Sequence, residues 1–252
     1  MKLKVVSFNI LCVDRGENYL IPDRAPRLRS VISPIDPDVI GIQEYRDPWE
    51  SHFKEIFPQY DMYNAWRSDG WDRESGPILW KRDKFDLLDK GCFWYSDTPE
   101  VMSGKEWDEI YHCNRICQYV KLRDKATGES FVFMNTHFGF GDNGQVKSAK
   151  LLSEYASRFA DLPLFVTGDF NMFSHFPAYT EMVKSFTDVN AATAKYDGNT
   201  FHNFGTVTEK NGPIDYCFVN GKVKPLSYKV IDELVDGFYP SDHYGLSIEL
   251  EI

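Results

Sequence analysis

Short apolar runs alternate along the chain with polar segments, and they show two kinds of periodicity. Runs of a few Val, Ile, Leu and Phe residues bounded by polar or turn residues are typical of strands, and they cover 3–11, 38–44, 78–81, 85–93, 118–122, 131–136, 164–167, 214–219 and 246–252. Segments with apolar residues at helical spacing cover 23–33, 48–57, 145–159 and 178–186. In the first of these, Asp23 is the expected N-cap and Pro26 falls in the first turn. The alternation predicts an α/β protein whose helices cover sheets.

Residues 61–125 differ in composition, being rich in Trp, Tyr, Asp and Gly. We expect β-hairpins and long loops here, some of which form walls of a site. Within this stretch, residues 66–75 combine Arg, Asp and Trp, which suits stacking on a base or a sugar. A surface loop with ordinary aromatic packing explains the same residues, and both interpretations stay open.

Short polar motifs lie at the ends of many predicted strands. They are SFN at 7–9, QE at 43–44, NTH at 135–137, GDFN at 168–171, IDY at 214–216 and SDH at 241–243. Ligands of α/β proteins bind where strands end, so this placement predicts a site. The motifs supply carboxylate and amide oxygens, which suit Mg²⁺ or Mn²⁺. Because they run from residue 9 to residue 243, we expect one domain, 1–252, in which both ends of the chain build the site.

Composition narrows the class of protein. With 42% hydrophobic residues among 252, the chain can bury a sizeable core, and its formal net charge of −10 argues against a protein that grips long nucleic acid. A short nucleotide, a sugar phosphate or a lipid head group is compatible with that charge. The five cysteines are odd in number and lack the spacing of a disulfide framework or a zinc site, which favours free thiols. No apolar run reaches the roughly 18 residues of a membrane span, no signal segment is evident and no obligatory protein partner is indicated, so we expect a cytoplasmic enzyme.

The ordered set FN, QE, TH, GDFN, IDY and SDH resembles the endonuclease/exonuclease/phosphatase family, which includes deoxyribonuclease I-like enzymes. The motifs follow the family order and span most of the chain, and the whole pattern is most similar to the small, uncharacterised bacterial branch. The resemblance implies a four-layer α/β sandwich, in which two packed mixed sheets carry helices on both outer faces.

Glu44 ends an apolar run, where a carboxylate is costly unless it is solvated or binds a cation. A carboxylate that bonds a helix N-terminus is the alternative interpretation. The resemblance implies that Glu44 is the main Mg²⁺ ligand, with Asn9 beside it and Asp242 assisting; Mn²⁺ is a possible substitute.

Asp169 and Asn171 are two residues apart, so on an extended strand both face the same way. Alone, GDFN fits a simple Asx turn. The resemblance implies that Asp169 orients or deprotonates the attacking water, and that Asn171 binds the phosphate or a second metal position.

The resemblance also implies catalytic parts for two histidines. Asp215 resembles an aspartate that pairs with a histidine, here expected to be His137. A carboxylate partner raises the pKa of an imidazole, so His137 would be a cation suited to stabilising phosphate charge or protonating the leaving oxygen. His243 is expected to contact the scissile phosphate or help to activate water.

Arg115 precedes a predicted strand and resembles an arginine that some bacterial members of the family place beside the site. A guanidinium there can hold a phosphate bidentately. A structural ion pair with a loop aspartate is the alternative. The remaining histidines lie outside these motifs, and we expect no part in catalysis for them: His52, His112, His175 and His202.

The motif set therefore predicts a Mg²⁺-dependent hydrolase, a phosphodiesterase or a phosphatase, that cleaves a small phosphorylated metabolite or head group by in-line attack of water. One alternative is a nuclease or 3′-exonuclease on short single strands, which predicts a basic or aromatic channel leading to Glu44. The other is a catalytically silent binding module of the same fold, and the intact motif set argues against it.

Overall fold

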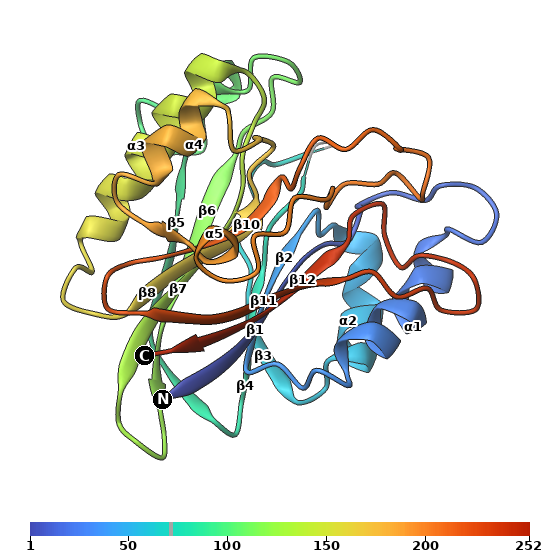
Figure 1. The fold of residues 1–252 in the computed structure, drawn as a ribbon, viewed down its shortest axis with the longest axis horizontal. Coiled ribbons are helices and arrows are strands. Elements are labelled where there is room, and N and C mark those ends of the chain that lie inside the picture. The colour runs from blue at the N-terminus through green and yellow to red at the C-terminus, as the bar shows by residue number, and fades with distance from the viewer. Residues whose placement is uncertain (71–72) are drawn as a thin grey trace.

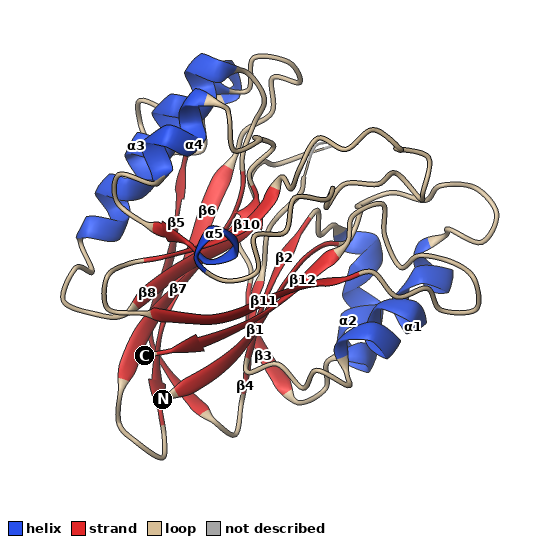
Figure 2. Ribbon diagram, in the orientation of Figure 1, coloured by secondary structure: helices blue, strands red, loops and turns tan. Residues whose placement is uncertain are grey.

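The computed structural model describes residues 1–70 and 73–252 and contains two six-stranded mixed sheets (Figures 1 and 2). Sheet 1 has the order β11 (Lys224–Ile231), β12 (Gly245–Glu251), β1 (Lys2–Asn9), β2 (Val39–Gln43), β4 (Ile78–Lys81) and β3 (Tyr60–Tyr63). Sheet 2 has the order β5 (Phe85–Trp94), β6 (Ile116–Asp124), β7 (Ser130–His137), β8 (Leu164–Asp169), β10 (Asp215–Val219) and β9 (Thr187–Asp188). The helices are α1 (Ile21–Ile32), α2 (Glu50–Ile56), α3 (Asp142–Ser157), α4 (Pro177–Met182) and α5 (Val189–Ala192), with 3₁₀ turns η1 (Asp47–Trp49) and η2 (Lys105–Trp107).

Three buried apolar clusters lie between the layers. One lies between the sheets and joins residues such as Val5 of β1 to Phe133 of β7. A second packs α1 and α2 on the outer face of sheet 1, and a third packs α3 and α4 on the outer face of sheet 2 (Figure 1). Because successive strand residues point to opposite faces, Phe133 faces the other sheet while Met134 faces the helices. The four-layer α/β sandwich implied by the family resemblance is thus confirmed.

Strand register brings the polar motifs to one end of the sandwich. The parallel pair β1–β2 places Asn9 beside Gln43, and the parallel pair β7–β8 places His137 beside Asp169. Antiparallel β10 begins there, with Asp215 opposite Asp169. The residues before β12 reach the same end, where the Ser241 hydroxyl donates to the Asn9 carbonyl at 2.7 Å.

A buried polar bridge joins the two sheets just behind this end. The side-chain oxygen of Asn135 accepts from Gln43 Nε2 at 2.7 Å and from the Thr167 hydroxyl at 3.1 Å, and its amide nitrogen donates to the Ile42 carbonyl at 2.6 Å. A Cβ atom at Gly41 would lie 2.5 Å from the Asn135 side-chain oxygen, so this close approach requires glycine. The bridge holds the two sheets at a set separation beside the site.

Several predicted elements need correction. In α1 the N-cap is Leu20, Asp23 lies in the first turn, and Pro26 is inside the helix; Asp14, distant in sequence, accepts from the Ile21 N–H at 2.7 Å. The stretch 48–57 begins as the 3₁₀ turn η1 before α2. The strands β3 and β11 were not predicted, because both lie at the edges of sheet 1 and are only partly buried.

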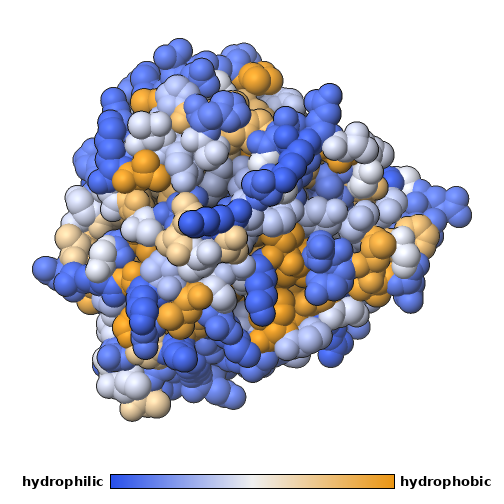
Figure 3. Space-filling view, in the orientation of Figure 1, coloured by the Kyte–Doolittle hydropathy of each residue, from blue (hydrophilic) through white to orange (hydrophobic). Residues whose placement is uncertain are grey.

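The surface and the loops add two observations. Figure 3 shows that hydrophobic side chains on the viewed face occur in separate patches among hydrophilic ones. None of the described helices has the length and apolar character needed to cross a bilayer. Within the predicted stacking segment 66–75, Trp71 and Asp72 fall outside the described residues, while Trp66 packs on Tyr45 with ring centroids 5.8 Å apart.

Candidate active site

The polar motifs surround a pocket of about 740 Å³ at the end of the sandwich where the strands meet. Most of the predicted site residues line it: Glu44, Arg115, His137, Asp169, Asn171, Asp242 and His243. Asn9 and Asp215 lie beneath the pocket and are almost completely buried. The structure therefore brings together every residue that the sequence predicted for the site.

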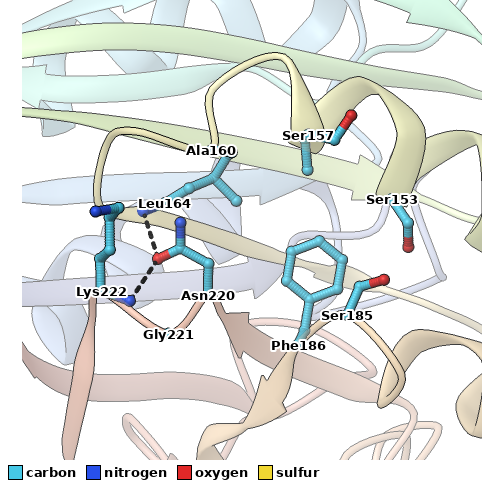
Figure 4. Close-up of a pocket in the computed structure, with 10 residues that line it drawn as sticks. Ser153, Ser157, Ala160, Leu164, Ser185, Phe186, Asn220, Gly221 and Lys222 are labelled. Carbon is cyan, nitrogen blue, oxygen red and sulfur yellow. Dashed lines mark hydrogen bonds between the residues drawn. The ribbon is translucent and has the colours of Figure 1, made fainter.

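Another pocket, of about 350 Å³, contains none of these residues (Figure 4). It lies beside α3 and the turn after β10, and the side-chain oxygen of Asn220 in its wall accepts from the Leu164 and Lys222 N–H groups at 3.2 and 3.1 Å. The residues that the sequence predicted for the site therefore line the larger pocket or lie beneath it, and none lines the pocket of Figure 4.

Glu44 follows β2 with a left-handed backbone, its φ being 59°. Such a conformation is costly for a non-glycine residue and is commonly found where function requires it. Its carboxylate accepts from Asn9 Nδ2 at 3.1 Å and from the Cys12 N–H at 3.1 Å. The backbone strain turns Glu44 out of the strand and into the pocket.

Asn9 links the two sheets at the centre of the site. Its amide nitrogen donates to Glu44 and also to Asp169 Oδ2 at 3.0 Å, and its amide oxygen accepts from the Leu11 N–H at 3.1 Å. These partners determine which end of the amide is nitrogen. The oxygen keeps one lone pair for a metal, so the predicted ligand part of Asn9 stays a prediction, while its bridging contacts position both carboxylates.

Asp169 ends β8 and is 1% exposed. Its Oδ1 accepts from the Asn171 N–H at 2.9 Å, and its Oδ2 lies 3.6 Å from His137 Nε2 and 3.7 Å from His243 Nε2. Asn171 has a φ of 48° and donates from its side chain to the Phe138 carbonyl at 3.0 Å. GDFN thus forms an Asx turn and also contributes to the pocket, so the two interpretations of this motif are compatible.

The predicted pairing of Asp215 with His137 is wrong. Asp215 Oδ2 lies 3.0 Å from His243 Nδ1. Asp215 and His137 both stand beside Asp169, but on the two strands that flank β8, so their backbones are about 10 Å apart, two strand spacings. The histidine of the SDH motif, which precedes β12, reaches Asp215 from the other sheet.

His243 is the cationic histidine of the site. Burial alone would lower its pKa, but the negative charges of Asp215 and Asp169 outweigh burial and raise the pKa to about 10. His243 is therefore an imidazolium at neutral pH, which was the state expected for His137. A protonated imidazole at this place donates to anionic oxygen. The ligand atoms of Asp169, Asp215 and His243 also lie close enough together to hold a metal ion.

His137 has a carboxylate partner that sequence reasoning missed. Its Nδ1 lies 3.3 Å from Glu74 Oε1, and Arg67 Nη1 donates to the same oxygen at 2.7 Å. Burial would raise the pKa of Glu74, yet Arg67, His137 and Arg115 together lower it to about 2. Glu74 lies in a polar loop with no strand pattern before it, and only its composition, rich in Arg and Asp, hinted at a part in the site.

For Arg115 the structure confirms the ion pair and leaves phosphate binding as a prediction. Its Nε donates to Asp108 Oδ2 at 2.9 Å, which is the expected ion pair with a loop aspartate. It also lines the pocket, and its Nη1 is buried without a hydrogen-bond partner among the described residues. Burial alone would lower the pKa of Arg115, but the negative charges of Glu74 and Asp108 outweigh burial and raise it. Arg115 is therefore always a cation, and its Nη1 is an unused hydrogen-bond donor.

The carboxylate oxygens of Glu44 and Asp242, on the sheet 1 side of the pocket, are suitable ligands for a divalent cation. Burial raises the pKa of Asp242, and the negative charge of Glu44 raises it further. Neither carboxylate forms an ion pair within the described residues. The positive charge of His243 opposes this rise in the pKa of Asp242. A bound hard cation would stabilise both carboxylates, since carboxylate and amide oxygens are its preferred ligands.

The other histidines lie outside the pocket. His202 is buried against the ring of Tyr244 at 3.9 Å, and burial lowers its pKa to about 4. It is neutral at pH 7 and packs as an aromatic ring. His112 and His175 are exposed and His52 is half-buried.

Comparison with known proteins identifies the family of the chain. The model of the endonuclease/exonuclease/phosphatase family matches residues 6–243. The mannosyl-6-phosphatase of Bacteroides thetaiotaomicron VPI-5482 is 30% identical, with a TM-score of 0.88 over 99% of this chain and 100% of that one. A family protein from Bacteroides vulgatus is 28% identical, with a TM-score of 0.91 over 100% and 99%. D. rerio TDP2, in complex with a single-strand DNA product, is 18% identical with a TM-score of 0.78 over 100% and 99%, and shares the fold. The chain therefore belongs to the endonuclease/exonuclease/phosphatase family, as its motifs indicate.

Proposed function

We propose that this protein is a Mg²⁺-dependent hydrolase that cleaves a phosphoester of a small phosphorylated metabolite or head group, with Mn²⁺ able to replace Mg²⁺. One observation carries the proposal: Oδ2 of Asp169 accepts from the Asn9 amide and faces two imidazole rings, at the floor of a pocket that also holds two carboxylates without an ion pair among the described residues. Family members hydrolyse phosphoesters, and this arrangement supplies the parts which that reaction requires.

The cation would be held by Glu44 and Asp242, with the Asn9 oxygen as a further ligand. When bound, it would neutralise phosphate oxygens as a Lewis acid. Glu44 is oriented by the Asn9 and Cys12 N–H groups. The unpaired state of both carboxylates supports this ligand set.

Asp169 orients the attacking water and accepts its proton. Its Oδ1 accepts from the Asn171 N–H and its Oδ2 from the Asn9 amide, and Oδ2 is the oxygen that faces His137 and His243. Asp215 and Asp169 raise the pKa of His243, so His243 is less suited than Asp169 to accept that proton. It instead donates to the developing charge on the phosphate, and Asp215 holds the ring in place.

On the other side of Asp169, His137 stabilises phosphate charge or protonates the leaving oxygen, and Glu74 orients its ring. Arg115 binds a phosphate oxygen through its unpaired Nη1. Asn171 completes the contacts to the phosphate from the turn after β8.

Two observations favour a small substrate. The net charge of −10 disfavours a long polyanion, and the relative that is 30% identical over nearly the whole chain is a mannosyl-6-phosphatase. The five cysteines are free thiols, which supports the reducing cytoplasm as the place of action. One domain spanning 1–252 is sufficient for this activity.

A nuclease acting on short single strands is the second candidate. A smaller pocket of about 330 Å³ shares Cys12 and Val13 with the main pocket and is lined by Arg46 and Arg73. Arg73 lies over the Trp66 ring at 4.1 Å, which provides the basic and aromatic character that the nuclease hypothesis predicted near Glu44. Asp14 and Asp47 line the same pocket and weaken its attraction for a polyanion.

The test is hydrolysis of p-nitrophenyl phosphate and bis(p-nitrophenyl) phosphate with Mg²⁺, with Mn²⁺ and with EDTA. Wild type is compared with Asp169→Asn and with the matched surface variant Asp161→Asn. We expect metal-dependent turnover that Asp169→Asn loses and Asp161→Asn keeps, and the monoester/diester ratio separates a phosphatase from a phosphodiesterase. Binding of Mg²⁺ without turnover of either compound, or of a short oligonucleotide, would contradict the proposal and favour a silent binding module.

A further inference from the structure

The outer part of the main pocket has a different character from its polar floor. Tyr111 lines it although its side chain is 63% exposed, and its ring packs edge-on against Phe140, with centroids 5.1 Å apart and an interplanar angle of 72°. More apolar side chains line the same pocket: Val13, Phe173, Phe176, Phe201 and Ile214. An exposed aromatic ring at the edge of a pocket is typical of a ligand contact.

The loop that carries Tyr111 is held in place before any ligand binds. Asp108 accepts from the Tyr111 N–H at 3.1 Å through one oxygen and from Arg115 Nε at 2.9 Å through the other. One buried carboxylate thus positions both the aromatic ring and the guanidinium. The loop therefore fixes the distance between Arg115, which would bind a phosphate, and Tyr111, which would contact a ring.

The opposite loop is attached to this one by further bonds. The Glu109 N–H donates to the Phe140 carbonyl at 2.9 Å, and a Glu109 carboxylate oxygen accepts from the Gly144 N–H at 2.9 Å. Gly141 has a φ of 101°, and a side chain there would run into Glu109. The glycine-rich segment after β7 thereby lets the two loops approach and fixes the Tyr111–Phe140 pair.

The distribution of charge limits the number of phosphates that the pocket can accept. Among the described residues, the cations of Arg and Lys lining it are Arg15, Arg67 and Arg115. Arg67 and Arg115 are buried at the floor beside Glu74 and Asp108, and Arg15 is exposed. A second phosphate in the outer part would leave water for a wall made mainly of neutral rings. Arg15 is the single exposed guanidinium there among the described residues, so the transfer is costly.

We propose that the substrate is a phosphomonoester whose alcohol is a neutral ring without a second phosphate, and that the face of this ring stacks on Tyr111. The inference rests on the proposed hydrolysis at the floor of the same pocket. Sugars and nucleosides both present a neutral ring with an apolar face, and the experiment distinguishes them.

The experiment measures kcat and KM with Mg²⁺ for glucose 6-phosphate, cytidine 5′-monophosphate, glycerol 3-phosphate, which has no ring, and glucose 1,6-bisphosphate, which has a second phosphate. The proteins are wild type, Tyr111→Ala, Tyr111→Phe and Ile110→Ala. Ile110 is the matched control, because it is 61% exposed in the same loop and does not line the pocket.

We expect wild type to prefer one of the two ring monophosphates over glycerol 3-phosphate and over the bisphosphate, and the preferred ring identifies a sugar or a nucleoside. Tyr111→Ala should lower the ring-to-glycerol ratio of kcat/KM about ten-fold, mainly through KM, since a stacking contact contributes of this order. Tyr111→Phe should keep the ratio, and Ile110→Ala should leave it unchanged.

A ratio that Tyr111→Ala does not change, or a bisphosphate hydrolysed as well as the monophosphate, would overturn the inference while the proposed hydrolase stands. Absence of turnover on all four compounds and on p-nitrophenyl phosphate would overturn the proposed function and the inference with it. The two failures are thus distinguishable by whether the enzyme hydrolyses any phosphoester.

Discussion

The two sheets contribute unlike halves to one site. Sheet 1 and its loops carry Glu44 and Asp242, two carboxylates that form no ion pair within the described residues. The part of the pocket around His137 of sheet 2 carries charges that are already compensated. Asp108 pairs with Arg115 between β5 and β6, and Glu74 pairs with Arg67 in the β3–β4 loop, which reaches across from sheet 1 to His137. The difference indicates that the first half is left negative for a cation, while the second half is built to receive an anion.

Several contacts cross the boundary between the halves. Asn9 of β1 donates to Asp169 of β8, and His243, which precedes β12, contacts Asp215 of β10. Behind them, the Asn135 bridge joins the sheets again. A site divided between two sheets therefore keeps its geometry without a covalent link between the halves.

The largest effect is expected from breaking the cation half. Glu44→Gln keeps the shape but removes the charge that the bound cation requires, so turnover with Mg²⁺ should fall about 10³-fold. Steady-state assays over a Mg²⁺ titration measure it, with Glu55→Gln on the exposed face of α2 as the matched control. Turnover that survives Glu44→Gln would show that the metal assignment is wrong.

The next effect is expected from the anion half. Asp215→Asn removes the main charge that raises the pKa of His243, so kcat/KM should fall about 10²-fold. Because that pKa is raised to about 10, the active imidazolium is present below pH 10 and is lost above it. In the variant the loss should begin at lower pH, and a pH–rate profile measures this shift. An alkaline limb at the same pH in both proteins would contradict the part given to His243.

A smaller effect should follow from Glu74→Gln. Its pKa of about 2 makes Glu74 an anion at every working pH, and the change leaves His137 in place with a weaker partner. We expect a loss of about ten-fold in kcat with little change in Mg²⁺ dependence, as for other groups that orient a functional histidine. If the variant needed much more Mg²⁺, Glu74 would belong to the cation half.

The smallest effect on chemistry and a clear effect on stability are expected from Asn135→Ala. The change leaves buried partners such as Gln43 Nε2 and the Ile42 carbonyl without one of their bonds, which costs about 2 kcal/mol of unfolding free energy. Urea denaturation measures the loss, and the reference is Asn143→Ala, an exposed amide in α3. An unchanged midpoint would show that packing alone holds the sheets together.

The sequence was informative where local pattern and position agree. The strand 78–81 has the predicted bounds, and the motifs after β1, β2, β7 and β8 lie together because parallel strands end at one edge. The edge strand β11 was missed because its residues are only partly buried and Pro225 lies at a bulge. The Asp215 partner was wrong because pairing depends on strand order, which local pattern does not reveal.

Glu74 illustrates the limit more sharply. It reaches His137 through a loop whose path depends on tertiary contacts, including the Ser75 N–H bond to the Tyr45 carbonyl at 2.9 Å. A carboxylate in such a loop has no periodicity or motif that marks it. Arg115 shows the converse: the ion pair predicted from its sequence context is confirmed with Asp108, and its Nη1, unpartnered among the described residues, leaves phosphate binding as a prediction.

The division into a cation half and an anion half is tested most directly by calorimetric titration of Mg²⁺, and separately of inorganic phosphate, into wild type, Glu44→Gln and His243→Gln. Glu44→Gln should weaken Mg²⁺ binding at least about ten-fold and keep phosphate binding measured without metal, whereas His243→Gln should do the reverse. Loss of both ligands in both variants, or Mg²⁺ binding that is indifferent to Glu44→Gln, would contradict the account.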